Sequence, residues 1–298
     1  MDNKTIQYSM EYCESLPKFG FGLSFVGWAY NEEENITEYL DRVMELLDKT
    51  VEDYEIIVVN DGSTDRTREI ILEYSAINCK IKLVDNPGNM GVAYAARNAI
   101  MRANKKFVMW QTVDWSYDIS HIRCFLDVLE TRNMDVIAGV RRRPVEAVNK
   151  LHKLIVGILR LFGFQHITRR SDTLWKAFVS INNYMLIRIL FGVPLSDYQN
   201  VCIYRTELIQ SINPETNSSF VNPEYLFKAF WQGANIAEVP INFIPRQKGK
   251  AKGTKVSSIA ASLRDIFFFY YHNIVIGRIN RENKGTIIRL ESDVWSTE

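Results

Sequence analysis

Apolar residues in the first half of the chain fall into short unbroken runs, and the segments between these runs carry apolar residues at helical spacing. An unbroken apolar run bounded by turn residues is typical of a strand covered on both faces in a parallel sheet. The pattern predicts strands over residues 23–29, 55–59, 81–84, 106–111 and 135–139, and helices over residues 64–74, 92–103 and 121–131. A further helix is expected to follow Asn31, and it carries apolar residues at helical spacing from Ile36 to Leu47. Strands that alternate with helices at this spacing indicate βαβ units and a mostly parallel α/β sheet.

The second half of the chain changes in composition after Val140. Helices are expected over residues 175–195, 222–232 and 257–279, and residues 197–204 are expected to return to the sheet as a strand or loop. Residues 237–244 predict a strand that Pro240 places near an edge or bend. The tail after Asn280 is polar and is expected to fray. We therefore divide the chain into a lead-in (1–20), an α/β domain (21–255, with an insertion at about 144–196) and a C-terminal amphipathic helix with its tail (256–298).

Polar residues follow the ends of the first two predicted strands. Ligands in open α/β sheets bind at the carboxyl ends of the strands, so these side chains are expected to face a crevice. The alternative is an ordinary strand-to-helix turn, in which Thr64 or Asp65 caps the second helix. Asn31 is likewise expected to cap the first helix, and Glu32 could simply be an acid of its first turn. The polar residues are Tyr30, Asn31 and Glu32 after the first strand and Asp61 after the second.

Composition excludes several classes of protein. The chain has 298 residues and a net charge of +1, which gives no general attraction to nucleic acid. Its four cysteines and four histidines are dispersed, which argues against a zinc site and a disulfide framework and fits a reducing compartment. No secretory signal and no window of about 18 uncharged apolar residues is present. A Rossmann dehydrogenase is disfavoured, since no G-x-G-x-x-G follows the first strand.

Several stretches, taken in order, resemble the family 2 glycosyltransferases, and most of all the branch that loads sugars onto polyprenyl phosphate. They are SFVGWAYNEEENI, VNDGSTD, NPGNMGVAYAARN, TVDWSYD, LFGVPLSDYQN, the Asn-Pro-Glu that opens a helix, and EVPINFIPRQKGKAKG. The resemblance covers about residues 21–255. It implies a GT-A-type nucleotide-binding sheet flanked by helices, and inverting transfer from a nucleotide diphosphate sugar.

The resemblance also implies roles for individual residues. Asp61 would accept a hydrogen bond from the base, and Asp114 would hold a divalent metal, Mg²⁺ or Mn²⁺, across the diphosphate. Asp114, Asp197 and Arg246 are the expected catalytic residues. The expected donor site comprises Tyr30, Asn31, Glu32, Asp61, Gly91, Arg97, Thr112 and Asp114.

The sequence departs from the family pattern at several positions. Thr112 replaces the first acid of the metal-binding motif, so metal binding is expected to be weak. Asn60 replaces an acid before Asp61, Trp28 stands where a proline is common, and the stretch after Asp197 lacks a Gly-Phe-Arg. These departures leave open an alternative in which basic residues replace the metal, and another in which the chain is a non-catalytic family member.

The acceptor side is expected to be basic. A phosphate acceptor is already anionic and needs cations to hold it, and Arg–phosphate pairs can be bidentate. Candidate acceptor residues are Arg141, Arg143, Ser180, Lys248 and Lys250. Residues 246–255, which we call the basic loop, could also be a solvated surface loop. A glycan hydroxyl acceptor, as in capsule or cell-wall polysaccharide synthesis, would instead need a carboxylate base, for which Asp197 and Glu224 are candidates.

Three apolar stretches with basic ends, residues 151–164, 174–195 and 259–279, are expected to lie in a membrane surface. Core or dimer-interface helices are the alternative. The sequence thus predicts a peripheral enzyme on the cytoplasmic face of the cell membrane. Its expected partners are a nucleotide diphosphate sugar, a polyprenyl phosphate or glycan acceptor and the membrane surface, with no nucleic acid; a homo-oligomer stays open.

Overall fold

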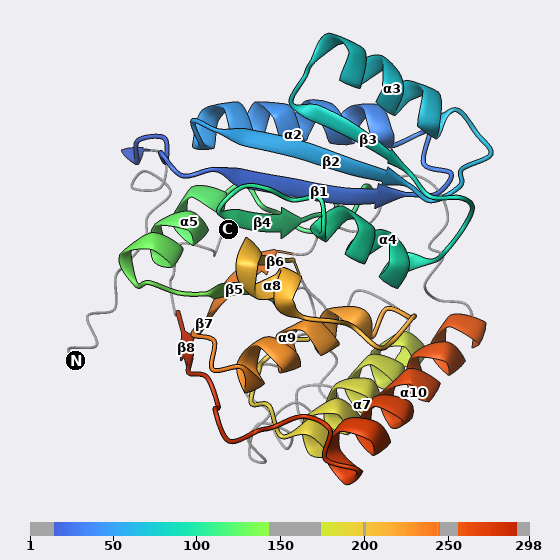
Figure 1. Ribbon diagram of the computed structural model, residues 1–298, viewed down its shortest axis with the longest axis vertical. Coiled ribbons are helices and arrows are strands. Elements are labelled where there is room, and N and C mark those ends of the chain that lie inside the picture. The colour runs from blue at the N-terminus through green and yellow to red at the C-terminus, as the bar shows by residue number, and fades with distance from the viewer. Residues whose placement is uncertain (1–14, 143–173, 199–200, 243, 245–255, 291–298) are drawn as a thin grey trace.

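The computed structural model describes residues 15–142, 174–198, 201–242, 244 and 256–290, without the side chains of residues 141–142, 174–182, 242 and 256. Within these residues one sheet of eight strands runs in the order β3-β2-β1-β4-β6-β5-β7-β8 (Figure 1). Only β6 is antiparallel to its neighbours, so the other strands of this sheet point the same way. The predicted fold class, a mostly parallel α/β sheet flanked by helices, is confirmed.

Most of the predicted strands form within a residue or two of the expected positions. Successive side chains of a strand point to opposite faces, so a run that is apolar throughout buries both faces. The strands are β1 (Leu23–Ala29), β2 (Tyr54–Asn60), β3 (Ile81–Asp85), β4 (Phe107–Trp110), β5 (Val136–Arg142), β6 (Cys202–Arg205), β7 (Ile236–Asn242) and β8 (Ile287–Arg289).

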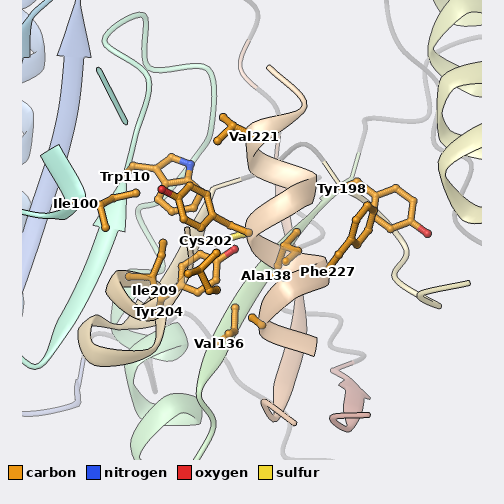
Figure 2. Close-up of a cluster of buried hydrophobic side chains, with 14 of the residues drawn as sticks. Ile100, Trp110, Val136, Ala138, Tyr198, Cys202, Tyr204, Ile209, Val221 and Phe227 are labelled. Atoms are coloured by element: carbon orange, nitrogen blue, oxygen red, sulfur yellow. The ribbon is translucent and has the colours of Figure 1, made fainter. Parts of the chain in front are cut away.

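The helices cover both faces of the sheet, and two hydrophobic clusters form beneath them. Ile56 and Val58 of β2 pack on the face covered by α2, α3 and α5, whereas Ile57 and Val59 pack on the other. Figure 2 shows part of this second cluster, where Trp110 and Tyr204 stack and Phe227 lies near Tyr198. The helices are α2 (Ile36–Thr50), α3 (Thr67–Ile77), α4 (Val92–Ile100), α5 (Ile122–Thr131), α7 (Leu174–Phe191), α8 (Thr206–Ser211), α9 (Val221–Trp231), α10 (Val256–Tyr270) and the π-helical turn η2 (Tyr271–Val275).

Three expectations about helix and chain ends are wrong. Asn31 does not cap the first helix, because α2 begins at Ile36 and Asn31 has left-handed backbone geometry, with φ of 52°. The helix expected to reach residue 195 ends at Phe191, where Gly192 takes a φ of 65° that glycine tolerates. The tail beyond Asn280 does not simply fray, since β8 pairs in parallel with the start of β7.

Pro240 lies where the sequence placed it, near an edge. The hydrogen-bonded register joins β8 only to Ile236–Glu238 of β7, so Pro240 lies past the end of that pairing. Proline has no backbone N–H, and at this position β8 offers no carbonyl for one to bond, so no hydrogen bond between β7 and β8 is lost.

Cys124 is disulfide-bonded, whereas Cys79 and Cys202 are free. Disulfide pairing depends on which cysteines the fold brings together, and their spacing in the sequence does not reveal this. In the part of the chain that the structure describes, no helix is long and apolar enough to cross a bilayer.

Candidate active site

The carboxyl ends of the parallel strands meet at one edge of the sheet, which we call the catalytic edge. Asp61 follows the last residue of β2, and Asp114 lies just past the end of β4. Because β1 separates these two strands, they are about 10 Å apart across the sheet. The two carboxylates that the sequence singled out therefore leave the sheet on the same side.

The loops that follow β1 and β2 are held together by hydrogen bonds. Asn31 N–H donates to Ser63 Oγ (3.0 Å), and Asn31 Oδ1 accepts from Thr64 N–H (2.8 Å). Glu32 N–H donates to Thr67 Oγ1 (2.8 Å). The polar residues after these strands thus fix each other's backbone, which gives a donor pocket a preformed wall.

Asp65 supports this pair of loops and the start of α3. Its carboxylate accepts from the N–H groups of Thr67 and Glu33. Although partial burial acts the other way, these hydrogen bonds hold the pKa of Asp65 below its usual value. The sequence offered Thr64 or Asp65 as the cap of this helix, but α3 begins at Thr67 and Arg66 occupies the N-cap position.

Asp61 is 5% exposed and organises the loop formed by residues 86–91. Its Oδ1 accepts from Asn86 Nδ2 (2.7 Å) and Met90 N–H (2.9 Å), and its Oδ2 accepts from Gly91 N–H (3.0 Å). A carboxylate has about four acceptor positions, so this set leaves capacity for one more donor. Asp61 and Gly91 are thus brought together, as the expected donor site requires.

Gly62 lets the same loop approach closely. Its φ is 73°, and a Cβ atom built on it would lie 2.5 Å from the backbone carbon of Gly88. Any side chain at this position would push the 86–91 loop away from Asp61.

Asn60, which replaces an acid, has a defined role in the fold. Its Nδ2 donates to Asp85 Oδ1 (2.8 Å), and its Oδ1 accepts from Ser63 N–H (3.0 Å). Arg68 completes the group with an ion pair to Asp85 (2.8 Å). Although partial burial opposes it, the bonds from Arg68 and Asn60 lower the pKa of Asp85. An amide serves here because it can both donate and accept.

Asp114 lies in a tight turn at the end of β4. Trp115 N–H donates to the Thr112 carbonyl (2.9 Å), and Trp115 takes a φ of 52° while its ring packs against Tyr39. Ser116 Oγ donates to Asp114 Oδ1 (2.6 Å), and Thr112 Oγ1 accepts from Ser116 N–H (3.3 Å). Thr112 thus shapes the turn in which Asp114 is presented.

The donor set of this turn fits a hard divalent cation. A carboxylate and a hydroxyl supply oxygen ligands, and Mg²⁺ commonly takes one or two carboxylates together with substrate phosphates and waters. No group of three acidic, His or Cys side chains converges among the described residues. A metal at Asp114 would therefore depend on the diphosphate of the donor for most of its ligands.

The end of β7 is tied to the Asp114 turn. Ile244 N–H donates to the Ser116 carbonyl (2.9 Å), and Arg141 at the end of β5 is paired in register with Ile241. The backbone thus brings Arg141 and the strand that leads into the basic loop to the catalytic edge. The predicted residues Arg143, Arg246, Lys248 and Lys250, and the stretch 151–164, lie outside the described residues, as do the side chains of Arg141 and Ser180.

Other predicted residues lie in different surroundings. Glu224 is fully buried and holds the loop at residues 215–216, accepting from both backbone N–H groups, while its carboxylate pairs with Lys228. It is thus engaged as a structural group and not presented as a base. Arg97 donates to Asn213 in the loop after α8, and Asp197 is 9% exposed beside Tyr198.

A buried group that the sequence did not reveal fixes the segment around Asp197. Glu238 of β7 accepts from Ser196 N–H and Oγ, and Arg289 of β8 donates to Glu238 (2.9 Å) and to the Pro194 carbonyl. Burial raises the pKa of Glu238, although the bonds from Ser196 and Arg289 oppose this. In the sequence, the only sign of this buried group is an acidic residue within the apolar run that forms β7.

A cavity of about 610 Å³ lies elsewhere, beside the amino ends of β7 and β8. It is lined by Glu215, Lys228, Trp231 and Arg278, among others. Since α9 ends at Trp231 and β7 begins at Ile236, this cavity is at the opposite edge from Asp61 and Asp114. It is not the site that the strand ends form.

The topology and the catalytic edge together define a GT-A-type glycosyltransferase. Residues 24–191 match the family model described as Glycosyl transferase family 2. The chain belongs to this family and is a glycosyltransferase.

Relatives with similar sequences include two dolichyl-phosphate beta-glucosyltransferases of Trichomonas vaginalis. ALG5C is 25% identical over 83% of this chain and 71% of its own length, and ALG5A is 26% identical over 83% and 73%. A poly-beta-1,6-N-acetyl-D-glucosamine synthase of Staphylococcus epidermidis is 38% identical over 33% of this chain and 23% of its own length.

Solved structures have the same fold. Glucosyl-3-phosphoglycerate synthase from Mycobacterium tuberculosis, in complex with UDP, has a TM-score of 0.55 at 18% identity, over 88% of this chain and 84% of that one. The structure of TarS from S. aureus with UDP-GlcNAc has a TM-score of 0.54 at 17% identity, over 88% and 68%. At these identities the likeness establishes the fold.

Proposed function

We propose that this protein transfers a hexose from a UDP-sugar to a polyprenyl phosphate, at the cytoplasmic face of a membrane. Glucose is the first candidate sugar, because relatives that match most of the chain are named dolichyl-phosphate beta-glucosyltransferases. UDP is the first candidate nucleotide, since the neighbouring folds were solved with UDP or UDP-GlcNAc.

The observation that carries the proposal is the convergence at the catalytic edge. Asp61 and Asp114 leave adjacent regions of one sheet edge, and the Ser116 carbonyl binds the backbone that leads into the basic loop. An acidic donor side beside a cationic acceptor side suits a reaction between two phosphorylated molecules.

Asp61 and the loop pair after β1 and β2 would bind and orient the nucleoside. Asp114, with Thr112 shaping its turn, would hold Mg²⁺ or Mn²⁺, which neutralises charge on the departing diphosphate when bound. The acceptor phosphate oxygen forms the new bond to the anomeric carbon as the bond to UDP breaks, with inversion. Because that oxygen is already anionic, no general base is needed. Arg141, Arg143, Ser180, Arg246, Lys248 and Lys250 remain our proposal for the acceptor side.

A transfer assay tests the proposal. Purified protein is incubated with labelled UDP-glucose, Mn²⁺ and detergent-dispersed polyprenyl phosphate. We expect label in the organic extract, released as free sugar by mild acid, and strongly reduced label with Asp114→Asn. Label found only in water-soluble saccharide would reject a lipid acceptor.

The same assay distinguishes a lipid phosphate acceptor from a glycan hydroxyl acceptor. A sugar hydroxyl must lose a proton, so a base at Asp197 would make Asp197→Asn nearly inactive. A phosphate acceptor needs no such base, and we expect Asp197→Asn to retain measurable transfer to lipid. Loss of all transfer by this correctly folded variant would favour a hydroxyl acceptor.

A further inference from the structure

An apolar ridge covers the outer side of α10 and η2. The side chains of Phe267 and Tyr271 are 53% and 56% exposed, and the exposed positions repeat at intervals of four residues. Residues four apart lie on one side of a helix, so these side chains form a continuous stripe. The ridge consists of Leu263, Phe267, Phe268, Tyr271, Val275 and Ile276.

The opposite side of the same helix is fixed in the protein core. Ile266 and Phe269 are fully buried, and Phe269 packs against Phe191 and Trp231. Asp265 accepts from the N–H groups of Asn217 and Ser218, which anchors the helix to the loop before α9. The ridge is therefore presented in a fixed orientation.

A helix that carries apolar side chains on both sides is normally buried on both sides. Figure 1 shows α10 beside α7 at the end of the molecule away from α2 and α3, and Ile189 of α7 is 73% exposed. The ridge thus lies on the half of the molecule opposite α3. Contiguous exposed surface of this kind marks an interaction site.

The charges around the ridge favour an anionic surface as its partner. Exposed cations lie on α10 and beyond η2 at Arg264, Arg281 and Lys284, although Arg264 also pairs with the buried Asp265 (3.1 Å). Glu282 is the exposed acid between residues 256 and 284. A second copy of the chain in a twofold contact would bring the same cations together. A bilayer with anionic headgroups would instead attract them, and aromatic side chains suit the headgroup boundary.

We infer that this ridge inserts into the headgroup region of an anionic membrane and docks the enzyme there. The inference rests on the proposed lipid acceptor, which must be met at a bilayer. It names the inserting side chains, with Phe267 and Tyr271 at the centre.

The test is flotation with phosphatidylcholine vesicles, with and without phosphatidylglycerol. Phe267→Gln/Tyr271→Gln should lower partitioning roughly tenfold or more, because two half-exposed aromatic side chains no longer enter the bilayer. Leu72→Gln/Ile77→Gln is the matched control, since it removes two exposed apolar side chains from α3 on the other face. This control should bind as the wild type does, and wild-type binding should increase with phosphatidylglycerol.

Equal vesicle binding by the ridge variant and the wild type would overturn the inference, as would absence of wild-type binding. A ridge variant that changes from dimer to monomer with unchanged vesicle binding would show a protein interface instead. Thermal unfolding verifies that the variant is folded.

A short-chain, water-soluble prenyl phosphate separates this inference from the proposed function. The ridge variant should transfer sugar to it at the wild-type rate and lose transfer only to acceptor in vesicles. If the wild type binds vesicles but transfers sugar to no prenyl phosphate, the role of the ridge in membrane binding is supported and the proposed acceptor is rejected.

Discussion

At the scale of single residues, Asp61 is the best-defined part of the site. Its carboxylate receives two backbone N–H groups and the Asn86 amide, so it builds the 86–91 loop as well as facing the edge. Asp114 is presented by a turn that Thr112 and Ser116 close. Asp61 was identifiable from the sequence because it directly follows an apolar strand, and Asp114 because the stretch TVDWSYD resembles the acidic motif of the family. Their hydrogen-bond partners were not, since they lie in other loops.

Gly62→Ala should weaken donor binding and destabilise the fold by about 1–3 kcal/mol. The added Cβ would meet the Gly88 backbone at 2.5 Å, at a φ of 73° that disfavours alanine. Gly88→Ala is the control, because a Cβ at Gly88 meets nothing within 4 Å. Its stability should stay within about 0.5 kcal/mol of wild type. Urea unfolding and UDP titration measure both variants, and equal behaviour would contradict this reading of the loop.

Thr112→Asp should strengthen Mn²⁺ binding in the UDP complex by roughly tenfold, because it adds a second hard carboxylate to the turn. The Thr112 hydroxyl accepts a hydrogen bond from Ser116 N–H, and a carboxylate at this position could accept the same hydrogen bond. Ser120→Asp adds the same charge at an exposed position further along the loop and should change little. Manganese titration monitored by electron paramagnetic resonance distinguishes them. Unchanged affinity in Thr112→Asp would place the metal away from this turn.

At the scale of elements, the hydrophobic pattern predicted most strands well but did not predict the structure of the C-terminal tail. The unbroken runs of β1, β2 and β4 and the loops after them were predicted closely. β8 was missed because three residues in a polar tail form a strand only when the edge of β7 is available. The short helix α8 was missed as well, since six residues give too little periodicity.

Arg289→Ala should destabilise the protein by about 1–3 kcal/mol at neutral pH, because it leaves buried Glu238 without its cation. Burial already raises the pKa of Glu238, and losing Arg289 would raise it further. A raised native pKa favours the protonated form, so the penalty appears as pH rises above the unfolded value of about 4.3. The loss should therefore shrink toward pH 4, as measured by urea unfolding.

Lys49→Ala is the control for this experiment, since its ion pair with Glu45 is largely exposed. Its effect on the free energy of unfolding should be small at either pH, because exposed ion pairs contribute little to stability. A pH-independent loss in Arg289→Ala would show that packing, and not the charge of Glu238, explains the role of Arg289.

At the scale of the whole molecule, the acids and the apolar ridge belong to different elements of the fold. The catalytic edge of the sheet gathers the acids and the end of β7, while α10 and η2 present an apolar ridge on the half of the molecule opposite α3 (Figure 1). The sequence indicated both regions, since the acids follow strands and the last helix is rich in aromatics. It did not indicate which aromatics are exposed, because that depends on the packing of α10 against α7 and α9.

Calorimetric titration of UDP-glucose, with and without Mn²⁺, tests the central claim most directly: Asp61 and Asp114 serve one donor pocket. Asp61→Asn should weaken binding under both conditions, because it would remove the proposed contact with the base and weaken the hydrogen bonds that hold the 86–91 loop. Asp114→Asn should bind the donor as wild type does without metal and lose only the gain from Mn²⁺. Titrations of both variants that match the wild type with and without metal would contradict the account.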